Sequence, residues 1–475
     1  MSVLLINPPS PGSAAAKLYV PPLGLAYVGA ALKERGIKAK VLDADAMEMT
    51  PSEVALAVSK EAPAVVGVTG LTPTINDCYR LLEAVRPVSP FLALGGPHAS
   101  ALGPKVMSEA PVGLDAVVCG EAEESFPRLV SALLDGKEPE PGIPGVLYGA
   151  GACENAEWPR VSDLDALPFP DRDSLPEERY RHPFSGGPFT TMITSRGCPY
   201  RCIFCDKHVS GSRWRPRSPE NVISEMRHVL NRGVGRIIIY DDLFTLDRER
   251  VIEICKGIVS EGLELKWKCE GRVNRVDREC LSWMKKAGCE MIAYGVESAS
   301  SKGLRFLQKD ISIDEVREAF ALTREAGIQT LGYFILGIPG ETMEDEMETV
   351  RLAIELDADY AQFGTLSPFP GTPLYDYASS QGWVQESRSV GPAERGECRP
   401  FISDGYWTPE RLEHIMKKAH QRFYFRPSYV LKRLKRISSL RELRTGALQA
   451  GRLAAWRVRS LKGGKRYRGT RKKHG

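Results

Sequence analysis

The chain has 475 residues, of which 43% are hydrophobic and 26% charged, and its formal net charge is +4. This length exceeds one ordinary core, so we expect two or three domains, and the composition is ordinary for a soluble globular protein. No uninterrupted run of about 18 apolar residues is present, which excludes a membrane-spanning helix. The N-terminus lacks a basic segment followed by a long apolar one, so we expect no signal peptide.

Residues 1–150 alternate short apolar segments with helical patterns and turn signals. Five segments are typical of strands: VLLIN, AKVLD, AVVGVTG, FLALGG and DAVVCG. This alternation predicts an α/β domain with a parallel, doubly wound sheet of the Rossmann-like kind. No G-x-G-x-x-G sequence follows the first strand, so the ordinary dinucleotide fingerprint is absent.

Ligands of doubly wound sheets bind outside the C-terminal ends of the strands. The turns NPPSPG, TGLTPT, GGPHAS and CGEAEES concentrate Gly, Pro, Thr and Ser at those ends. We therefore expect a binding site at this edge of the sheet. Its candidate residues are Thr69, Thr72, Gly96, His98, Gly120 and Glu121.

A proline-rich segment without periodicity, LDALPFPDRDSLP, lies within residues 151–185 and predicts a semi-rigid linker. Residues 186–385 resume the alternation with six candidate strands: FTTMITS, GRIIIYDD, LKWKCEG, EMIAYGVES, TLGYFILGIPG and YAQFGTLSPF. Helical segments are expected to begin near Pro219, Arg248, Asp277, Ile313 and Met343. Six βα units predict a partial (βα)6 barrel with its site at the C-terminal ends of the strands. Residues 386–475 form an extension.

The segment GCPYRCIFC leaves the first barrel strand and holds Cys198, Cys202 and Cys205 in a C-x3-C-x2-C spacing. A structural zinc site takes four ligands, and a disulfide framework takes an even number of cysteines. Three thiolates can instead hold three irons of a 4Fe–4S cluster and leave the fourth iron open to a ligand that is not protein.

The other eight of the eleven cysteines are scattered, mostly in apolar strand-like or helical segments. We expect them to be buried free thiols in a reducing cytoplasm rather than disulfides. They are Cys78, Cys119, Cys153, Cys255, Cys269, Cys280, Cys289 and Cys398.

The cysteine triplet, with Phe204 before its last member and a six-unit α/β barrel around it, resembles the radical S-adenosylmethionine (SAM) enzymes. In that family the open iron chelates the methionine amino and carboxylate groups of SAM, and an electron from the cluster releases a 5′-deoxyadenosyl radical. The resemblance implies that the three cysteines bind the cluster and that Phe204 lies beside the cofactors. Zinc binding by the same cysteines is the alternative, and the remaining strand ends argue against it.

The ends of the next four barrel strands also match this family, in the segments YDDLFT, CEGRVN, YGVES and FILGIPGET. Each segment alone has an ordinary interpretation, because a strand-end Asp is commonly a helix cap and a Gly commonly a turn residue. Together the resemblance gives them roles around SAM: Asp241 and Asp242 near the amino group, Arg272 on the carboxylate, Glu297 and Ser298 near the ribose, and Gly337 and Gly340 at the adenine.

The N-terminal region resembles the cobalamin-binding domain that precedes this barrel in one large subclass. The turns GGPHAS and GEAEES and the LPFP linker carry that likeness. Many cobalamin proteins supply a cobalt-ligating histidine from a D-x-H-x-x-G motif, whereas the equivalent turn here, LDADAMEM, has none. We expect His98 to position a corrin or phosphate group rather than to bind cobalt. Two readings stay open: cobalamin bound without a protein ligand, which we favour, or a degenerate domain that binds none.

The resemblance implies an enzyme that abstracts hydrogen from an unactivated carbon and, in its methyltransferases, delivers a methyl group from cobalamin. A small or lipid-like substrate and an electron donor such as flavodoxin or ferredoxin belong to that expectation. The alternatives are an oxidative cyclase or rearrangement enzyme of the same subclass with a porphyrin-like or hopanoid-like substrate, or a non-catalytic cobalamin or iron–sulfur sensor. A methylthiotransferase is disfavoured because no second cysteine triplet precedes Cys198.

The C-terminal part of the extension is basic, with 21 Lys and Arg from Arg411 onward against two acids, Glu413 and Glu442. Apolar residues recur at helical spacing among the cations between Arg422 and Lys462, which indicates amphipathic helices. One interpretation is a solvated charged helix. The other is docking on an anionic membrane surface by a cytoplasmic protein, peripheral on the inner face. The aromatic residues hardly alternate with the later cations, so we do not expect a nucleic-acid partner.

Overall fold

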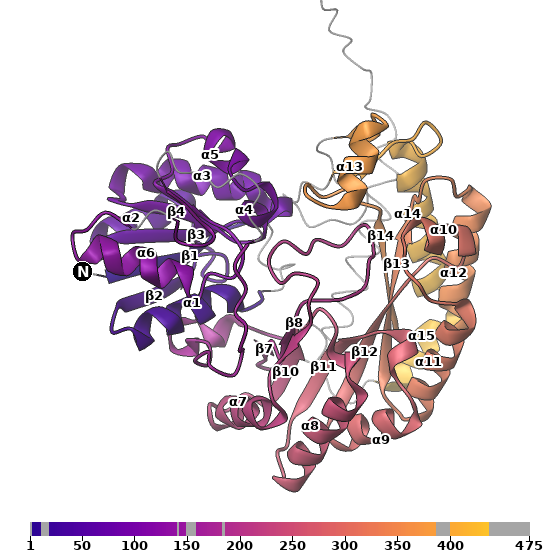
Figure 1. Ribbon diagram of the computed structural model, residues 1–475. Helices are drawn as coiled ribbons and strands as arrows, with labels where there is room; N and C mark the ends of the chain where they lie inside the picture. Colours follow the sequence, from indigo (N-terminus) through magenta and orange to yellow (C-terminus); the bar gives the residue numbers. More distant parts are fainter. Residues whose placement is uncertain are drawn as a thin grey trace, which may run out of the picture.

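The computed structural model describes residues 2–10, 19–139, 142–148, 158–182, 186–385 and 400–436. Figure 1 shows two lobes, an N-terminal lobe in indigo and purple and a larger C-terminal lobe in magenta, orange and yellow. Each lobe is built on its own six-stranded sheet. The α/β architecture expected from the sequence is therefore confirmed.

The N-terminal sheet has the strand order β2-β1-β3-β4-β5-β6. Its strands are β1 (Ser2–Asn7), β2 (Lys38–Asp43), β3 (Val65–Thr69), β4 (Leu92–Gly95), β5 (Ala116–Val118) and β6 (Val146–Tyr148). The first five are parallel, and β6 pairs antiparallel with β5 at the edge. The order reverses between β1 and β3, and such a switch point is where doubly wound sheets open a crevice for ligands.

Helices cover both faces of this sheet, as a doubly wound fold requires. They are α1 (Leu23–Glu34), α2 (Pro51–Glu61), α3 (Ile75–Val85), α4 (Pro97–Leu102), α5 (Lys105–Glu109) and α6 (Ser125–Leu134). One apolar core joins the sheet to α1 and α6, and a second core joins its other face to α2 and α3. Strand residues divide between the two cores by alternation, so Leu5 belongs to the first and Leu4 to the second.

The C-terminal sheet is entirely parallel and its strands follow chain order. They are β7 (Thr190–Met192), β10 (Arg236–Ile239), β11 (Lys266–Gly271), β12 (Cys289–Glu297), β13 (Gln329–Leu336) and β14 (Tyr360–Thr365). Because β7 and β14 remain at the edges, the sheet is a partial barrel rather than a closed one.

Five of the seven described barrel helices begin within one residue of the predicted starts, α10 and α13 were not predicted, and each of the seven has a side-chain cap. Their ranges are α7 (Pro219–Asn231), α8 (Arg248–Ser260), α9 (Arg278–Lys286), α10 (Ser301–Phe306), α11 (Ile313–Glu325), α12 (Met343–Glu355) and α13 (Pro373–Ser380). Ser218, Asp247 and Asp277 accept the N–H three residues onward at the starts of α7, α8 and α9. Ser312 and Thr342 form complete capping boxes at α11 and α12.

The linker packs against both lobes. Arg172, buried in its first 3-10 turn, donates to the backbone oxygen of Thr191 at 2.9 Å and to Glu225 of α7 at 2.6 Å. On the other side, Asp171 accepts an ion pair from Lys33 of α1 at 2.6 Å. These contacts tie the N-terminal lobe to the barrel at the level of the first barrel strand.

The extension continues along the barrel with the short β15 (Val384–Gln385) and β16 (Phe401–Ile402), then α14 (Pro409–Tyr424) and α15 (Pro427–Arg436). Helix α15 lies against the N-terminal end of β14, where Lys432 pairs with Asp357 at 2.7 Å. Within the described ranges, no helix is both long enough and apolar enough to cross a membrane. The basic tail from residue 437 onward, Cys153 and Cys398 lie outside the described residues.

Candidate active site

The cysteine loop, residues 197–211, is closed at its base by two short antiparallel strands, β8 (Ser195–Arg196) and β9 (Arg215–Pro216). Gly197 has a φ of +87°, and a Cβ there would lie 2.2 Å from the backbone oxygen of Arg213, so only glycine fits. Cys202 is buried, Cys198 is half-buried and Cys205 is exposed.

The three thiols lie in a positively charged setting. Lys207 donates to the backbone oxygens of Cys198, at 3.1 Å, and Tyr200. A hydrogen bond from the Cys205 thiol, together with the nearby charges of Lys309 and Arg272, lowers the pKa of Cys202 to about 6. The same hydrogen bond raises the pKa of Cys205, and burial raises that of Cys198. The nearby cations thus favour the thiolate of Cys202, and three adjacent thiols fit an iron–sulfur cluster held by three cysteines.

No three His, Cys, Asp or Glu side chains in the described part of the chain are grouped so that they could hold a single metal ion. The six other cysteines that the structure describes, Cys78, Cys119, Cys255, Cys269, Cys280 and Cys289, are buried free thiols, as expected.

Asp241 and Asp242 support the cysteine loop rather than presenting two free carboxylates. Asp241 is 2% exposed and accepts hydrogen bonds from the backbone N–H and hydroxyl of Thr194, at 2.5 and 2.6 Å, and from the hydroxyl of Ser195, at 2.7 Å. The predicted first strand is split into β7, which joins the barrel sheet, and β8, which pairs with β9. Asp242 accepts the N–H of Gly197 at 2.7 Å and remains exposed, so only Asp242 keeps an accessible oxygen.

Arg272 is 5% exposed and holds the loop from the end of β11. Its guanidinium lies 3.6 Å from the ring centroid of Tyr200, inside the cysteine loop. Its Nε donates to Asn274 at 3.1 Å, and its Nη2 donates to the backbone oxygens of Lys309 and Asp310. Among the described residues, Nη1 has no hydrogen-bond partner. Because Nε and Nη2 are already bonded, Arg272 has no two free nitrogens for the predicted two-point contact with the SAM carboxylate. Nη1 is the nitrogen that can bind it.

Glu297 forms a buried ion pair with Lys309, with 2.6 Å between Oε1 and Nζ. Both groups lie over Gly295, where an added Cβ would come within 2.4 Å of Glu297 and 2.5 Å of Lys309. Burial disfavours the charge on Lys309, but Glu297 and the Cys202 thiolate outweigh it and raise the pKa of Lys309. The sequence pattern did not single out Lys309, because it lies 12 residues after Glu297, outside the strand-end motif YGVES.

The remaining barrel candidates lie close by but contact protein. The hydroxyl of Ser298 donates to Glu341 at 2.8 Å. Gly337 and Gly340 occupy turns with φ values of +83° and +81°, which favour glycine, and a Cβ on Gly337 would lie 2.3 Å from the Leu412 side chain of α14. Phe204 packs against the small apolar cluster that includes Leu307, Ile338 and Leu366.

A second site opens between the lobes, at the C-terminal edge of the N-terminal sheet. It is a cavity of about 350 Å³, which we call the interlobe cavity. The walls from the N-terminal lobe are mostly apolar or glycine: Leu5, Leu23, Leu25, Val28, Gly67, Val68, Leu71, Ala93, Gly95, Gly96, Val118, Gly120 and Phe126. The barrel side contributes Ile193, Arg196, Val209 and Ser210.

Four of the six predicted N-terminal residues line this cavity, namely Thr69, Gly96, Gly120 and Glu121. His98 and Thr72 do not. The His98 ring is 4% exposed, with Nδ1 3.1 Å from the Thr72 hydroxyl and Nε2 3.4 Å from that of Tyr79. Burial lowers the pKa of His98 to about 4, so it is a neutral core histidine. The structure thus contradicts the expectation that His98 positions a corrin or phosphate, and Thr72 acts as its partner.

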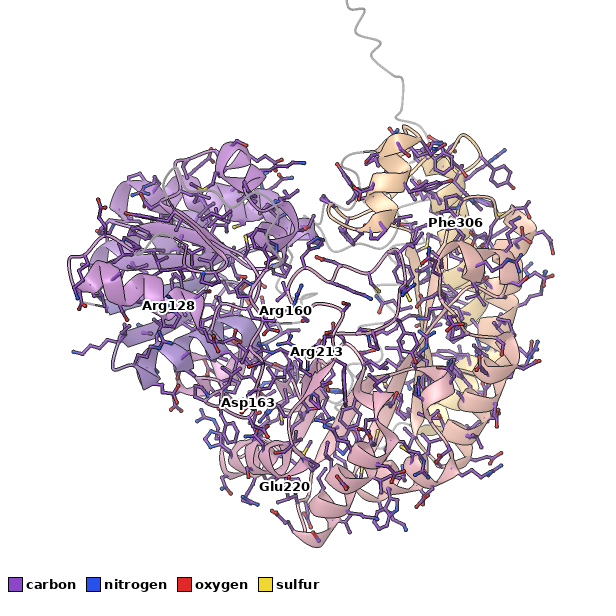
Figure 2. All side chains as sticks on the ribbon, in the orientation of Figure 1. Arg128, Arg160, Asp163, Arg213, Glu220 and Phe306 are labelled. Carbon is purple, nitrogen blue, oxygen red and sulfur yellow. The ribbon has the colours of Figure 1, made fainter. Side chains whose placement is uncertain are left out.

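The Glu121 carboxylate bonds to the linker and to the barrel. Its carboxylate receives two hydrogen bonds from Arg215, at 2.5 and 2.8 Å, and one from the N–H of Val161, at 2.6 Å. Arg196 pairs with Glu123 at 2.6 Å and with Glu121 at 3.4 Å. Figure 2 shows Arg160 and Arg213 in the same region, where the two lobes meet.

Comparison with known proteins defines the class. The family description "Radical SAM superfamily" matches residues 192–353, and "B12 binding domain" matches residues 10–130. An uncharacterized methyltransferase of Pyrococcus horikoshii is 35% identical over 442 residues, which cover 91% of this chain and 94% of the relative. The anaerobic magnesium-protoporphyrin IX monomethyl ester cyclase of Rubrivivax gelatinosus is 30% identical over 388 residues, covering 79% of this chain and 69% of the relative.

Two solved structures share the fold. The methyltransferase TsrM of Kitasatospora setae, with cobalamin and a 4Fe–4S cluster bound, gives a TM-score of 0.74 at 19% identity, covering 96% of this chain and all (100%) of that one. The enzyme OxsB, with aqua-cobalamin and SAM bound, gives 0.73 at 16% identity, covering 97% and 71%.

The chain belongs to the family of cobalamin-dependent radical SAM enzymes, which includes named methyltransferases and cyclases. The family expected from the sequence is thereby confirmed. The expected cofactors, a 4Fe–4S cluster, SAM and cobalamin, are those that these structural neighbours bind.

Proposed function

We propose that this protein methylates an unactivated carbon of a small-molecule substrate, using a 4Fe–4S cluster, SAM and cobalamin. The observation that supports it best is the adjacency of two sites. The cysteine loop carries the three thiols, and Val209 and Ser210 of the same loop form a wall of the interlobe cavity. Radical generation and methyl donation require their cofactors to face one substrate, and this adjacency provides that.

Cys198, Cys202 and Cys205 would hold the cluster, and Asp242 and Arg272 would fix the loop that presents them. When bound, the cluster and SAM supply the radical chemistry. Around them, Arg272 offers Nη1 and Lys309 offers an ammonium group, both suited to a carboxylate. Glu297 keeps Lys309 charged and holds it over Gly295. Asp242 has an exposed carboxylate that suits an amino group.

Cobalamin would occupy the interlobe cavity. Its mostly apolar wall, with Gly67 inside β3 and Gly95 and Gly96 at the end of β4, suits a large apolar group placed against the sheet. No histidine is among the described residues that line it, and both ring nitrogens of His98 are engaged elsewhere. We therefore propose that the chain provides no imidazole ligand for cobalt, which agrees with the expectation from the LDADAMEM turn.

A second candidate function is oxidative cyclisation of a porphyrin-like substrate. The cyclase of Cereibacter sphaeroides is 32% identical over 373 residues, although the chain spans only 61% of that relative. The methyltransferase relative of Pyrococcus horikoshii is instead covered over 94% of its length. We prefer methylation for that reason.

We further propose a cytoplasmic location, electron supply by a flavodoxin or ferredoxin, and docking of the basic tail on an anionic membrane surface to reach a lipid-like substrate. Val430 and Leu431 of α15 are 44% and 55% exposed, which supplies an apolar start for such docking. The test is co-sedimentation with vesicles of anionic lipid, full length against a chain truncated after Arg436. The cut spares Tyr429 and Lys432, which bond to the barrel. Equal sedimentation of both proteins would remove the membrane proposal.

The test of the main proposal uses anaerobically reconstituted protein. It should bind one 4Fe–4S cluster and one cobalamin, and it should cleave SAM to 5′-deoxyadenosine. A product that carries an added methyl group should accumulate on expression and disappear in Cys202→Ala. Retention of the cluster in the triple variant Cys198→Ala/Cys202→Ala/Cys205→Ala would contradict the assignment, and a product without added mass of one CH₂ would favour the cyclase.

A further inference from the structure

Arg196 stands at the junction of the two cofactor sites. It is 7% exposed, lies in β8, and is followed directly by Gly197 and Cys198 of the cysteine loop. Its guanidinium reaches into the other lobe, where it pairs with Glu123 at 2.6 Å and lies 5.0 Å from the ring centroid of Tyr27. Arg196, Glu123 and Tyr27 all line the interlobe cavity.

The cysteine loop is therefore bracketed by cavity walls. Ile193 and Arg196 precede Cys198, and Val209 and Ser210 follow Cys205. The β8–β9 pairing closes the loop at its base, and Arg215 of β9 forms an ion pair with Glu121 of the other lobe. A group that fills the cavity must contact both ends of the loop that carries the three thiols.

We propose that Arg196 is a positioning residue that couples cobalamin occupancy to the conformation of the cluster-binding loop. This inference rests on the proposed function, since it takes cobalamin as the occupant of the cavity. The amide-bearing rim of a corrin offers hydrogen-bond acceptors and donors to Arg196 and Glu123. Glu123, Glu121 and Tyr27 already hold the guanidinium, a corrin that bonds to it restricts it further, and the backbone of β8 carries that constraint to Cys198 two residues later.

Coupling between two sites is reciprocal. Cobalamin must then strengthen the hold of the loop on its cluster, and the cluster must raise the affinity for cobalamin by the same factor. Typical coupling between sites changes affinity about 5-fold to 150-fold. Neither effect requires substrate or turnover, so both can be measured on the resting protein.

The experiment measures how fast a ferrous-iron chelator removes the cluster, followed by its visible absorbance, with and without hydroxocobalamin. In the wild-type protein, cobalamin should slow cluster loss by about 5-fold or more. The test variant is Arg196→Met/Glu123→Met, which replaces both buried partners by apolar groups and leaves neither charge unpaired. In this variant the rate should be the same with and without cobalamin, although both cofactors still bind.

Two further proteins sharpen the test. Arg196→Lys keeps the charge and should retain part of the cobalamin effect that Arg196→Met/Glu123→Met loses. Arg232→Met removes a solvent-facing contact between barrel and linker, with Asp173 and Glu177, and should leave the effect as in the wild type. The cobalamin dissociation constant should be about 5-fold or more higher for Cys198→Ala/Cys202→Ala/Cys205→Ala than for the wild type, since reciprocity requires the cluster to favour cobalamin binding.

The failures are distinguishable. A wild-type protein that binds no cobalamin, or holds no cluster, would overturn the proposed function itself. A wild-type protein that binds both, but loses its cluster at one rate regardless of cobalamin, would overturn only the coupling. An undiminished cobalamin effect in Arg196→Met/Glu123→Met would show that the coupling does not pass through Arg196.

Discussion

At the C-terminal edge of the N-terminal sheet the cavity wall is mostly Leu, Val, Gly and Phe residues, whereas at the same edge of the barrel Asp, Arg, Glu and Lys converge on the cysteine loop. Both edges follow parallel strands and both are rich in polar and glycine residues in the sequence. In the N-terminal lobe, however, polar residues such as His98 and Glu121 turn to protein partners. In the barrel, Arg272 and Lys309 stay beside the thiols.

The difference follows from the groups that each edge has to receive. A large organic cofactor gains most of its binding from apolar contact with a preformed cavity. A charged cluster and a zwitterionic methionine need fixed charges, which are strong where solvent is reduced. Substitutions at the two edges should therefore affect different cofactors.

The largest separation is expected for Ala93→Phe. Ala93 lies on β4, is 1% exposed and lines the interlobe cavity. A phenyl ring there should fill the space and weaken cobalamin binding at least about 100-fold, at an overpacking cost of about 1–3 kcal/mol. SAM cleavage with a chemical reductant should continue. Absorbance titration with hydroxocobalamin measures the first effect and 5′-deoxyadenosine formation the second.

Leu94→Phe is the matched control, because Leu94 follows Ala93 on β4 and is equally buried on the opposite face of the sheet. It should keep cobalamin affinity within about 3-fold of the wild type, since it overpacks the core without entering the cavity. Wild-type cobalamin affinity in Ala93→Phe would mean that the corrin binds elsewhere.

The converse separation is expected for Arg272→Lys. A lysine keeps the charge but cannot stack on Tyr200, hold the two backbone oxygens and still reach a carboxylate. SAM affinity should fall about 10-fold to 30-fold, the loss of one charge-assisted hydrogen bond. Cobalamin affinity should be unchanged. Equilibrium dialysis with SAM on the reconstituted protein provides the measurement.

Arg275→Lys serves as the control because Arg275 donates to the hydroxyl of the same Tyr200, at 2.8 Å, from an exposed position. We expect less than a 3-fold change there, as is usual for exposed contacts. Equal losses in both variants would assign the effect to Tyr200 rather than to the carboxylate.

His98 tests whether the N-terminal polar residues are structural. In His98→Gln the EPR spectrum of bound cob(II)alamin should keep the wild-type form, without nitrogen splitting from a lower ligand in either protein. The pKa of His98 is lowered to about 4 by burial, so between that value and its unfolded value of about 6.5 the unfolded chain binds the extra proton. Wild-type stability therefore falls as the pH drops through this window.

Through His98, the free energy of unfolding of the wild type should fall by about 1–2 kcal/mol between pH 7 and pH 5, and His98→Gln should not show this fall. Chemical denaturation at the two pH values measures it. Splitting that appears in the wild type and vanishes in the variant would instead make His98 a cobalt ligand.

The sequence was sufficient for most strands and their succession along the chain, for five capped helix starts and for the three cysteines, because each depends on local patterns of about 3 to 15 residues. It was not sufficient for the direction in which a strand-end side chain points. Glu121 turns toward Arg215, 94 residues away, and Asp241 toward Thr194, 47 residues away. Such partners are set by tertiary packing, which no local motif encodes. Lys309 was missed for the same reason.

The smallest effect concerns the fifth barrel strand, where Glu346 accepts the N–H groups of Gly337, at 2.6 Å, and Ile338, at 3.1 Å. Burial raises its pKa well above the ordinary value, the charge of Glu341 raises it further, and burial also raises the pKa of Glu341. Oε2 of Glu341 and Oε2 of Glu346 are both buried without a hydrogen-bond partner in the part of the chain that the structure describes, and the raised pKa values favour a shared proton in this pair. The Gly337 turn is thus fixed from behind by a neutral acid rather than by a ligand.

Because the folded-state pKa is raised, the native state retains a proton that the unfolded chain loses above about pH 4.5, and stability falls as the pH rises through that window. Glu346→Gln keeps an oxygen for both N–H groups and gains an amide that donates to Glu341. Its stability at pH 8 should exceed that of the wild type by about 1 kcal/mol, with little difference at pH 4.5. Denaturant unfolding at both pH values measures this. Glu344→Gln, which changes an exposed carboxylate on the same helix, should show no such gain, whereas an equal gain there would assign the effect to net charge rather than to the buried pair.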